Sequence, residues 1–307
     1  MDSTVFPGED GAVPFWLEVQ DPDDQELEFI RVRFNLHPLA IEDCRQKNQR
    51  PKLDDYQGYF FMVIFALQGS VLEAARVPLG EYHLFVGKSG MITVHWGESP
   101  EFAANLKRLG DPTFPFPSTV HHLFYFLTEP LVDSFFPFLE EMDDHLDLLQ
   151  DKIVARANPE VLQELFKLKQ VLVRLRKVLS PQRDLFLSLA SPIHAGVQAD
   201  VLPYMRDLHD HLSRAYELVD SYRDLLTGAM DVYLSTVSNR LNDVMKRLTI
   251  VATVFMPLSF ITGFFGMNFG YLTRHLISPE AFWAGLTLML LSLLGMYWWF
   301  KVKGWLG

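Results

Sequence analysis

Two long runs of residues without any charge stand near the end of the chain, at 248–268 and 281–300. A helix needs about 20 apolar residues to cross the hydrocarbon core of a bilayer, and each run meets that length. Two buried helices of a soluble protein are the alternative, but the aromatic end of the second run is typical of a membrane interface. We therefore expect a transmembrane domain at 244–307, made of a first helix at about 246–266, a loop at 266–280, a second helix at about 281–300 and a tail at 301–307.

Basic residues flank the outer ends of the two runs. Lys246 and Arg247 precede the first run, and Lys301 and Lys303 follow the second. Because basic residues are retained on the cytosolic side of a membrane, this pattern predicts cytosolic termini and a connecting loop on the outside. The start of the chain shows no basic region followed by an apolar core, so we expect no secretory signal. The predicted location is the cell (inner) membrane.

A helical pattern leads without a break into the first run. From about residue 199 onwards, apolar side chains recur at spacings of three and four, and no proline occurs between Tyr204 and Met256. A helix of about 60 residues is about 90 Å long, roughly three times the hydrocarbon thickness of a bilayer. Such a helix must bury its apolar stripe against partners, which predicts an oligomer.

The first 117 residues carry the strand signals of the chain. Apolar stretches rich in aromatic and β-branched residues alternate with turn residues, and Gly87 to Gly90 form a hairpin signal. One helix is expected at 37–44, with Asn35 as its N-cap and Pro38 in its first turn. The expected strands lie at 15–19, 59–66, 82–86 and 91–95.

Helical periodicity replaces the strand signals downstream. A helix at 122–151 should be kinked or split by Pro130 and Pro137, and Asn158-Pro159 starts another. The first is acidic in its second half and the next carries a basic stripe, which suggests an antiparallel hairpin, although two solvated helix faces are the more common explanation of such charge runs. The predicted fold is therefore α+β: a cytosolic α/β/α domain at 1–243, with its sheet in 1–117 and its helical part and stalk in 118–243, and a very long stalk helix that continues into the first transmembrane helix.

Composition narrows the class of function. The formal net charge of −11 argues against nucleic acid, which needs a basic surface, and is compatible with divalent cations as ligands. The single Cys44 excludes an intramolecular disulfide and a Cys-based zinc cluster, and we expect it to be half-buried. We find no Gly-rich phosphate loop, nucleophile elbow or HExxH motif, so we do not expect an enzyme. A membrane-anchored scaffold or enzyme is the alternative from a different class.

One face of the first transmembrane helix carries small, weakly polar and thioether side chains. Bulky residues such as Phe255 and Phe264 lie largely elsewhere. Such a stripe is either a seam of helix packing or, where several copies surround an axis, the lining of a pore with apolar rings that gate by excluding water. The candidate pore-lining residues, continued into the stalk, are Asp231, Asn242, Met245, Leu248, Ala252, Met256, Ser259 and Gly263.

The first run ends in the tripeptide Gly266-Met267-Asn268, which precedes a short loop and the second run. Gly266 permits a backbone conformation that bulkier residues avoid, so the helix can end sharply there. Asn268 then places an amide oxygen at the pore mouth. Because Mg²⁺ dehydrates reluctantly, a ring of such oxygens is suited to bind the hydrated ion weakly and to release it again.

These residues resemble the CorA family of divalent metal transporters, also called the two-helix GMN family. Besides the GMN tripeptide, the resemblance covers stalk and membrane blocks at 231–239, 242–246 and 253–263 and N-terminal blocks at 37–43 and 49–52. It implies a homopentamer with a cytosolic funnel and a five-fold pore through the lipid bilayer. It also implies conduction of hydrated Mg²⁺, often with Co²⁺ and Ni²⁺, driven by the membrane potential without ATP.

The resemblance further implies regulation by Mg²⁺ bound between the cytosolic domains of neighbouring subunits. The matching positions are Asp43 and Asp207, and Glu42 and Glu129 match a second such site. Apposed carboxylates repel each other and a cation relieves that repulsion, so loss of the ion would loosen the interface. Mg²⁺ is then both the transported and the regulatory ion, and no organic cofactor is expected.

Three features depart from the family pattern. Ser259 stands where Thr is common, and the Pro-Glu usually found just after GMN comes only at Pro279-Glu280, beyond Arg274. The basic cluster after the second run is thin. A proton-coupled zinc transporter of the same superfamily is the alternative function; the histidines at 121–122 and 209–211 invite it, but no Cys/His cluster of zinc spacing accompanies them.

Overall fold

The computed structural model describes residues 14–47, 49–68, 77–111, 113–191, 200–268, 270, 274 and 279–305. The chain divides into two compact units, Met1–Met230 and Asp231–Gly307. Helix α7 (Leu202–Phe265) runs from the first unit into the second.

A five-stranded sheet with the order β1-β5-β4-β3-β2 forms the centre of the first unit. β1 pairs with β5 in parallel, whereas all other neighbours pair antiparallel. The four predicted strands are confirmed, and β2 is a short polar edge strand that the sequence pattern does not predict. The strands are β1 (Phe15–Gln20), β2 (Lys52–Tyr56), β3 (Tyr59–Leu67), β4 (Leu79–Gly87) and β5 (Gly90–His95).

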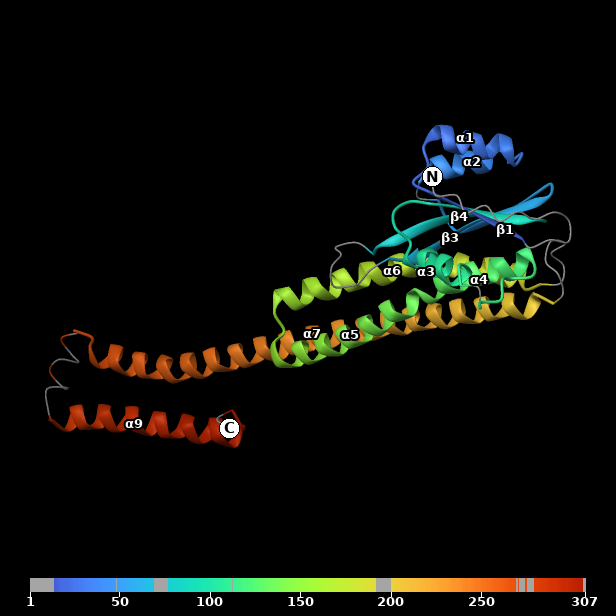
Figure 1. Ribbon diagram of the computed structural model, residues 1–307. Helices are drawn as coiled ribbons and strands as arrows, with labels where there is room; N and C mark the ends of the chain where they lie inside the picture. Colours follow the sequence, from blue (N-terminus) through green and yellow to red (C-terminus); the bar gives the residue numbers. More distant parts are fainter. Residues whose placement is uncertain are drawn as a thin grey trace. The chain divides into compact units, whose positions relative to one another are not determined.

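Helices cover both faces of this sheet (Figure 1). α1 and α2 lie on one face, and α3, α4 and α6 lie on the other, which confirms the predicted α/β/α layering within this unit. The helices that precede α7 are α1 (Asp24–Arg33), α2 (Pro38–Arg45), α3 (Pro100–Leu109), α4 (Val120–Asp133), α5 (Phe135–Arg156) and α6 (Pro159–Leu189).

The start of α2 differs from the prediction. Its N-cap is His37, whose Nδ1 accepts a hydrogen bond from the Leu39 N–H at 3.2 Å. Asn35, the predicted N-cap, has a φ of 51° and lies in the turn between α1 and α2. Asparagine tolerates this left-handed conformation because its short polar side chain bonds locally. The residue therefore reverses the chain direction instead of capping the helix.

The helical stretch predicted at 122–151 is split, as expected, into the two helices α4 and α5. The break falls at Ser134, so that Pro130 lies inside α4 and Pro137 lies in the first turn of α5. A proline is tolerated in the first turn because the N–H groups there have no partner within the helix. The two prolines therefore lie on either side of the break and not at the break itself.

α5 and α6 contact each other, but not through the predicted match of an acidic with a basic helix. Their ion pair has the opposite polarity, since Lys152 of α5 pairs with Glu164 of α6 at 3.4 Å. Two basic residues of α6 contact α7 instead, since Arg176 and Arg183 lie 5.7 and 4.6 Å from the ring centroid of Tyr216. The other basic residues are exposed, as in the alternative of solvated helix faces: Lys167, Lys169, Arg174 and Lys177.

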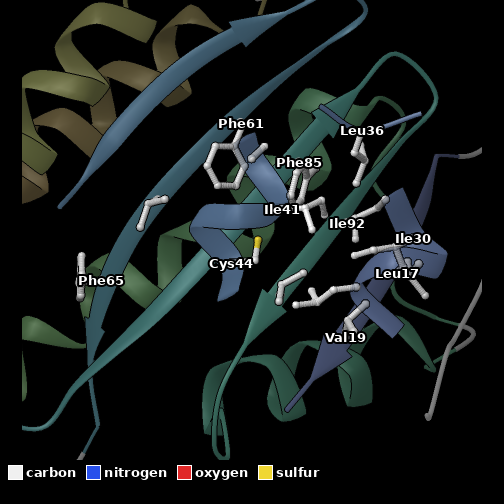
Figure 2. Packing of buried hydrophobic residues seen from close by; sticks show 14 residues of the cluster. Leu17, Val19, Ile30, Leu36, Ile41, Cys44, Phe61, Phe65, Phe85 and Ile92 are labelled. Carbon is white, nitrogen blue, oxygen red and sulfur yellow. The ribbon is translucent and has the colours of Figure 1, made fainter. Parts of the chain in front are cut away.

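A hydrophobic core lies between the sheet and the helix pair α1 and α2 (Figure 2). Ile41 and Cys44 of α2 pack there with Phe61 of β3 and Phe85 of β4. Cys44 is fully buried, not half-buried as expected, and its Sγ lies 3.4 Å from Nδ1 of His83. Burial of apolar surface contributes about 25 cal/mol per Å². This packing fixes α2, and with it the candidate site residues of that helix, on the sheet.

A glutamine from the helical layer completes the edge of β3 beyond the end of β2. β2 begins with the pair Lys52 and Val63, so Phe65 has no β2 partner. Gln182 of α6 accepts a hydrogen bond from the Phe65 N–H at 2.9 Å and donates one to the Phe65 carbonyl at 3.1 Å. Because buried backbone groups need partners, this amide ties α6 to the sheet.

The first part of α7 packs on the first unit with a regular spacing. Its buried positions recur at intervals of three and four residues, as in a coiled coil. Beyond Tyr233, none of the described residues of α7 is buried. The buried positions within the first unit are Met205, Leu208, Leu212, Ala215, Val219, Tyr222, Leu226 and Ala229.

The second unit holds the end of α7 and the helix α9 (Pro279–Val302). Both helices are long and apolar enough to cross a membrane. They contain the predicted transmembrane helices at 246–266 and 281–300. Of the described residues of α9, only Gly285 and Phe300 are buried. One chain therefore leaves most of the apolar surface of this unit uncovered.

Candidate functional site

The candidate pore-lining residues all lie on α7, and all of them are exposed in the single chain. At 100° per residue they share an arc of about 120° on the helix surface. Met256 is 73% exposed and Leu248 is 60% exposed. One continuous face of α7 is thus left uncovered by the chain itself, and it consists of Asp231, Asn242, Met245, Leu248, Ala252, Met256, Ser259 and Gly263.

The side of α7 away from this face is the side that α9 contacts. Ile250, Val254 and Ile261 are partly covered and lie away from the pore-lining arc. The ring of Phe265 lies against Gly285 of α9, where an added Cβ would be only 3.2 Å from the ring. α9 therefore lies on the side of α7 opposite the candidate pore-lining residues and leaves their face uncovered.

Gly266, Met267 and Asn268 follow directly after α7. The N–H of Gly266 donates to the Thr262 carbonyl at 2.9 Å and that of Met267 donates to the Phe264 carbonyl at 3.3 Å, which closes the last turn. The predicted reason for the glycine is wrong, because Gly266 has no positive φ; an added Cβ would instead lie 3.1 Å from the Thr262 oxygen. Asn268 is exposed beyond the helix end.

On α2, Asp43 borders an open hollow with a volume of about 560 Å³, which Glu42 also lines. The Nζ of Lys52 donates to Asp43 Oδ2 at 2.5 Å and lies 3.0 Å from Asp54 Oδ2. Partial burial acts to lower the pKa of Lys52, but the hydrogen bonds to Asp43 and Asp54 leave that pKa above its ordinary value. A charged ammonium therefore stands beside Asp43.

Asp207 and Glu129 meet at one tyrosine hydroxyl. The Oη of Tyr125 lies 2.9 Å from Asp207 Oδ2 and 2.7 Å from Glu129 Oε1. Burial raises the pKa of Tyr125, and hydrogen bonds to the two carboxylates raise it further. The hydroxyl therefore keeps its proton and serves as a donor. The structure thus brings two predicted site residues together through a third, Tyr125, that the sequence pattern does not predict.

His211, one of the histidines considered for a zinc function, lies beside this group, which the sequence does not predict. Its Nδ1 is 2.7 Å from Asp133 Oδ1, and its Nε2 is 3.8 Å from Asp207 Oδ1. Asp207 and His211 are four residues apart on α7, as Tyr125 and Glu129 are on α4, and such pairs share one helix face. That spacing is a readable signal, but it does not reveal that the faces of α4 and α7 meet.

Asp43 and Asp207 belong to different layers of the first unit. α2 covers one face of the sheet, while α4, which carries the Tyr125 bonded to Asp207, covers the other (Figure 1). Within one chain, the described residues hold no group of three or more His, Cys, Asp or Glu side chains placed to bind a metal ion. Carboxylates are the protein ligands that Mg²⁺ prefers, so the donor type fits.

A family model described as CorA-like Mg²⁺ transporter protein matches residues 11–301 of the chain. The chain belongs to this family. Mg²⁺ is the ion that CorA-like proteins are described as transporting, and the family is one of ion transporters rather than enzymes.

Relatives of this CorA-like chain match it over nearly its whole length. The putative metal ion transporter YfjQ of Bacillus subtilis is 37% identical over 296 residues, which cover 95% of this chain and 89% of that protein. The cobalt/magnesium transport protein CorA of Thermotoga maritima is 33% identical over 317 residues, 99% of this chain and 86% of that protein. The solved CorA magnesium transporter of Methanocaldococcus jannaschii has a TM-score of 0.84 at 23% identity and covers 98% of this chain and 94% of its own. The observed fold is thus that of a CorA protein.

A zinc transport protein is also related to this CorA-like chain. ZntB of Yersinia enterocolitica is 32% identical over 187 residues, which cover 59% of this chain and 54% of that protein. Two histidines that invite a zinc function have structural partners here. His122 packs edge-on against the ring of Tyr204, and Nδ1 of His209 lies 3.2 Å from Asp210 Oδ1.

Proposed function

We propose that this protein is a homopentameric channel that imports hydrated Mg²⁺ across the cell membrane, with Co²⁺ and Ni²⁺ as further substrates. The observation that carries the proposal is the uncovered face of α7. Its residues from Asp231 to Gly263 are exposed in one chain, and α9 contacts the opposite side. Five copies around an axis cover this face and turn it into the wall of a pore.

The order of side chains along α7 suits a path for a hydrated cation. Asn268 supplies amide oxygens at the outer entrance, and Ser259 adds a hydroxyl further in. Met256 and Leu248 form apolar rings that stop conduction when they exclude water. Asp231 attracts cations at the cytosolic end. A divalent ion gains about 4.6 kcal/mol per 100 mV on moving inward, twice the value for a single charge, so transport needs no ATP.

We place residues 1–243 in the cytosol and residues 244–307 in and around the inner membrane, with both termini cytosolic. The basic residues that flank the two apolar helices support this orientation. The partners are other copies of the chain, the lipid bilayer and divalent cations, since a net charge of −11 disfavours nucleic acid.

Cytosolic Mg²⁺ closes this channel by binding between subunits. In the proposed assembly Asp43 of one copy and Asp207 of the next share one ion, while Glu42 and Glu129 take part in a second site. The absence of a metal-binding group among the described residues of a single chain supports ligands from two copies. Without the ion, the apposed carboxylates repel each other and the interface loosens. Closure at high cytosolic Mg²⁺ is then negative feedback.

Asn268→Ala tests the pore assignment. In liposomes with a negative internal potential, this variant should assemble as the wild type does but lose Mg²⁺ uptake, because it lacks the entrance ring of amide oxygens. Asn239→Ala is the matched control, since it removes the same group from an exposed position of α7 outside the pore-lining arc. Its uptake should be unchanged. Mg²⁺ uptake by an intact Asn268→Ala oligomer would contradict the assignment.

A proton-coupled zinc transporter is the second candidate, favoured by the similarity to ZntB. It requires Zn²⁺ uptake that depends on a pH gradient. A Mg²⁺ channel driven by the membrane potential does not need that gradient, so the two candidates differ in one measurable property.

A further inference from the structure

Lys52 already forms an ion pair with Asp43, one of the proposed regulatory carboxylates. Its Nζ lies 2.5 Å from Asp43 Oδ2 and 3.0 Å from Asp54 Oδ2. The side chains of Lys52 and Asp43 are only 30% and 20% exposed. Because water screens a half-buried pair less than an exposed one, the ammonium is a strong partner for Asp43.

The fold holds the ammonium of Lys52 in this place. Its backbone is paired with Val63 in the sheet, and its Nζ lies 5.5 Å from the ring centroid of Phe61, within the range of a cation–π contact. Arg45, which lies on the same helix as Asp43, pairs with Asp24 of α1 at 3.2 Å. Lys52 is thus the cation that the fold directs to Asp43.

Apart from this lysine, the described charged residues that line the hollow beside Asp43 are all acidic. Lys52 is the one cation among the described residues that line the hollow. Its ammonium is paired with an oxygen of Asp43 that a metal ion would bind. The positive charge repels an incoming divalent cation, while the carboxylates attract it. The carboxylates that line the hollow are Glu42, Asp43, Asp54 and Asp55.

We propose that Lys52 is an internal competitor for the regulatory Mg²⁺ and sets the ion concentration at which the channel closes. The inference rests on the proposed regulation through Asp43 and Asp207. At low Mg²⁺ the ammonium holds Asp43 and keeps it from the metal. When Mg²⁺ binds Asp43, the ammonium moves to Asp54, which it already contacts. This second carboxylate keeps the displaced charge paired, which lowers the cost of the exchange.

The test measures how much Mg²⁺ protects the full-length oligomer from a protease. Lys52→Met removes the charge and keeps the chain length, so the half-protecting Mg²⁺ concentration should fall about fivefold, which is about 1 kcal/mol. Lys52→Arg keeps the charge and should stay near the wild type. Lys47→Met is the matched control: it removes the same charge from an exposed lysine that packs on Trp96, outside the hollow. Its Mg²⁺ requirement should not change.

The proposal that Lys52 competes with Mg²⁺ would be contradicted if Lys52→Met had an unchanged or higher Mg²⁺ requirement together with a wild-type melting temperature in EDTA. Should methionine lower that melting temperature, Lys52→Gln repeats the test with a polar side chain, and the same shift is expected. Failure of the proposed regulation looks different. In that case the wild type gains no protection from Mg²⁺, or Asp43→Ala and Asp207→Ala are protected as the wild type is.

Discussion

At the scale of single residues, both proposed regulatory carboxylates are hydrogen-bonded before a metal ion binds. Asp43 accepts from Lys52 and Asp207 accepts from Tyr125. A carboxylate that is already bonded must exchange one partner for another when the ion arrives. In the proposed regulation, the partners tune the affinity of the site for the ion, by competition at Asp43 and by fixing the orientation of the carboxylate at Asp207.

The buried thiol of Cys44 gives a prediction at the same scale. Burial raises the pKa of this thiol, and the neighbouring charge of Asp43 raises it further. Because the thiolate is the nucleophile, iodoacetamide at pH 8 should label Cys44 more than about tenfold more slowly in the native protein than in the denatured one. Mass spectrometry of the labelled peptide measures both rates. Equal rates would show that the packing of α2 on the sheet does not shield the thiol.

At the scale of the elements, α9 has two glycines with different surroundings. An added Cβ at Gly285 would lie 3.2 Å from the ring of Phe265, whereas none of the described atoms lies within 4 Å of such a Cβ at Gly295. Phe265 is the last residue of α7 and directly precedes Gly266. The contact at Gly285 therefore sets the position of the helix end that presents Asn268.

Gly285→Leu should reduce Mg²⁺ uptake, because leucine must push the ring of Phe265 and the end of α7 away from α9. Gly295→Leu places the same side chain in open space on the same helix and should leave uptake unchanged. Uptake into liposomes and the oligomeric state in detergent are measured for both variants. Equal uptake by the two would show that the contact with Phe265 does not matter for conduction.

Elements with a strong apolar pattern follow from the sequence, and some short elements do not. β3 is a continuous apolar run and α7 has a sustained helical period, so both can be predicted without tertiary contacts. α1 and α3 are short, yet each has a readable start, in the capping box of Asp23 with Glu26 and in the Ser99 N-cap before Pro100. β2 is short and polar, and its pairing with β3 defines it as a strand.

The features of the candidate site also differ in whether the sequence predicts them. The sequence places the candidate pore-lining residues on one face because they lie along one helix, where spacing fixes direction. The partners of the carboxylates cannot be read from it, since Tyr125 and Asp207 are 82 residues apart and Lys52 reaches Asp43 from a neighbouring element. Such contacts depend on how elements pack, and a single sequence does not state that.

At the scale of the whole molecule, one chain leaves most of the described apolar residues of its second unit uncovered. None of the described residues of α7 beyond Tyr233 is buried, and few of those of α9 are. Lipid can cover the bulky apolar side chains, whereas a face of small and weakly polar side chains packs better against other copies. This surface therefore supports the proposed assembly of several copies.

Cysteine cross-linking distinguishes the two sides of α7 in that oligomer. With a short bismaleimide, Met256→Cys should link neighbouring copies because Met256 faces the common axis in the proposed pentamer. Ile250→Cys is the control, since this residue is partly covered and lies outside the pore-lining arc. Native Cys44 is buried and should add little background. Links through position 250 but not through position 256 would place the pore on the wrong side of the helix.

The central claim is that the membrane potential drives Mg²⁺ through this protein and that Mg²⁺ on the cytosolic side stops it. The most direct measurement is ion uptake into liposomes that contain the purified protein, with Mg²⁺, Co²⁺ and Zn²⁺ compared at a set potential, with and without a pH gradient. We expect Mg²⁺ uptake that follows the potential, needs no pH gradient and falls as Mg²⁺ on the cytosolic side rises. Uptake of Zn²⁺ alone, and only with a pH gradient, would contradict the account.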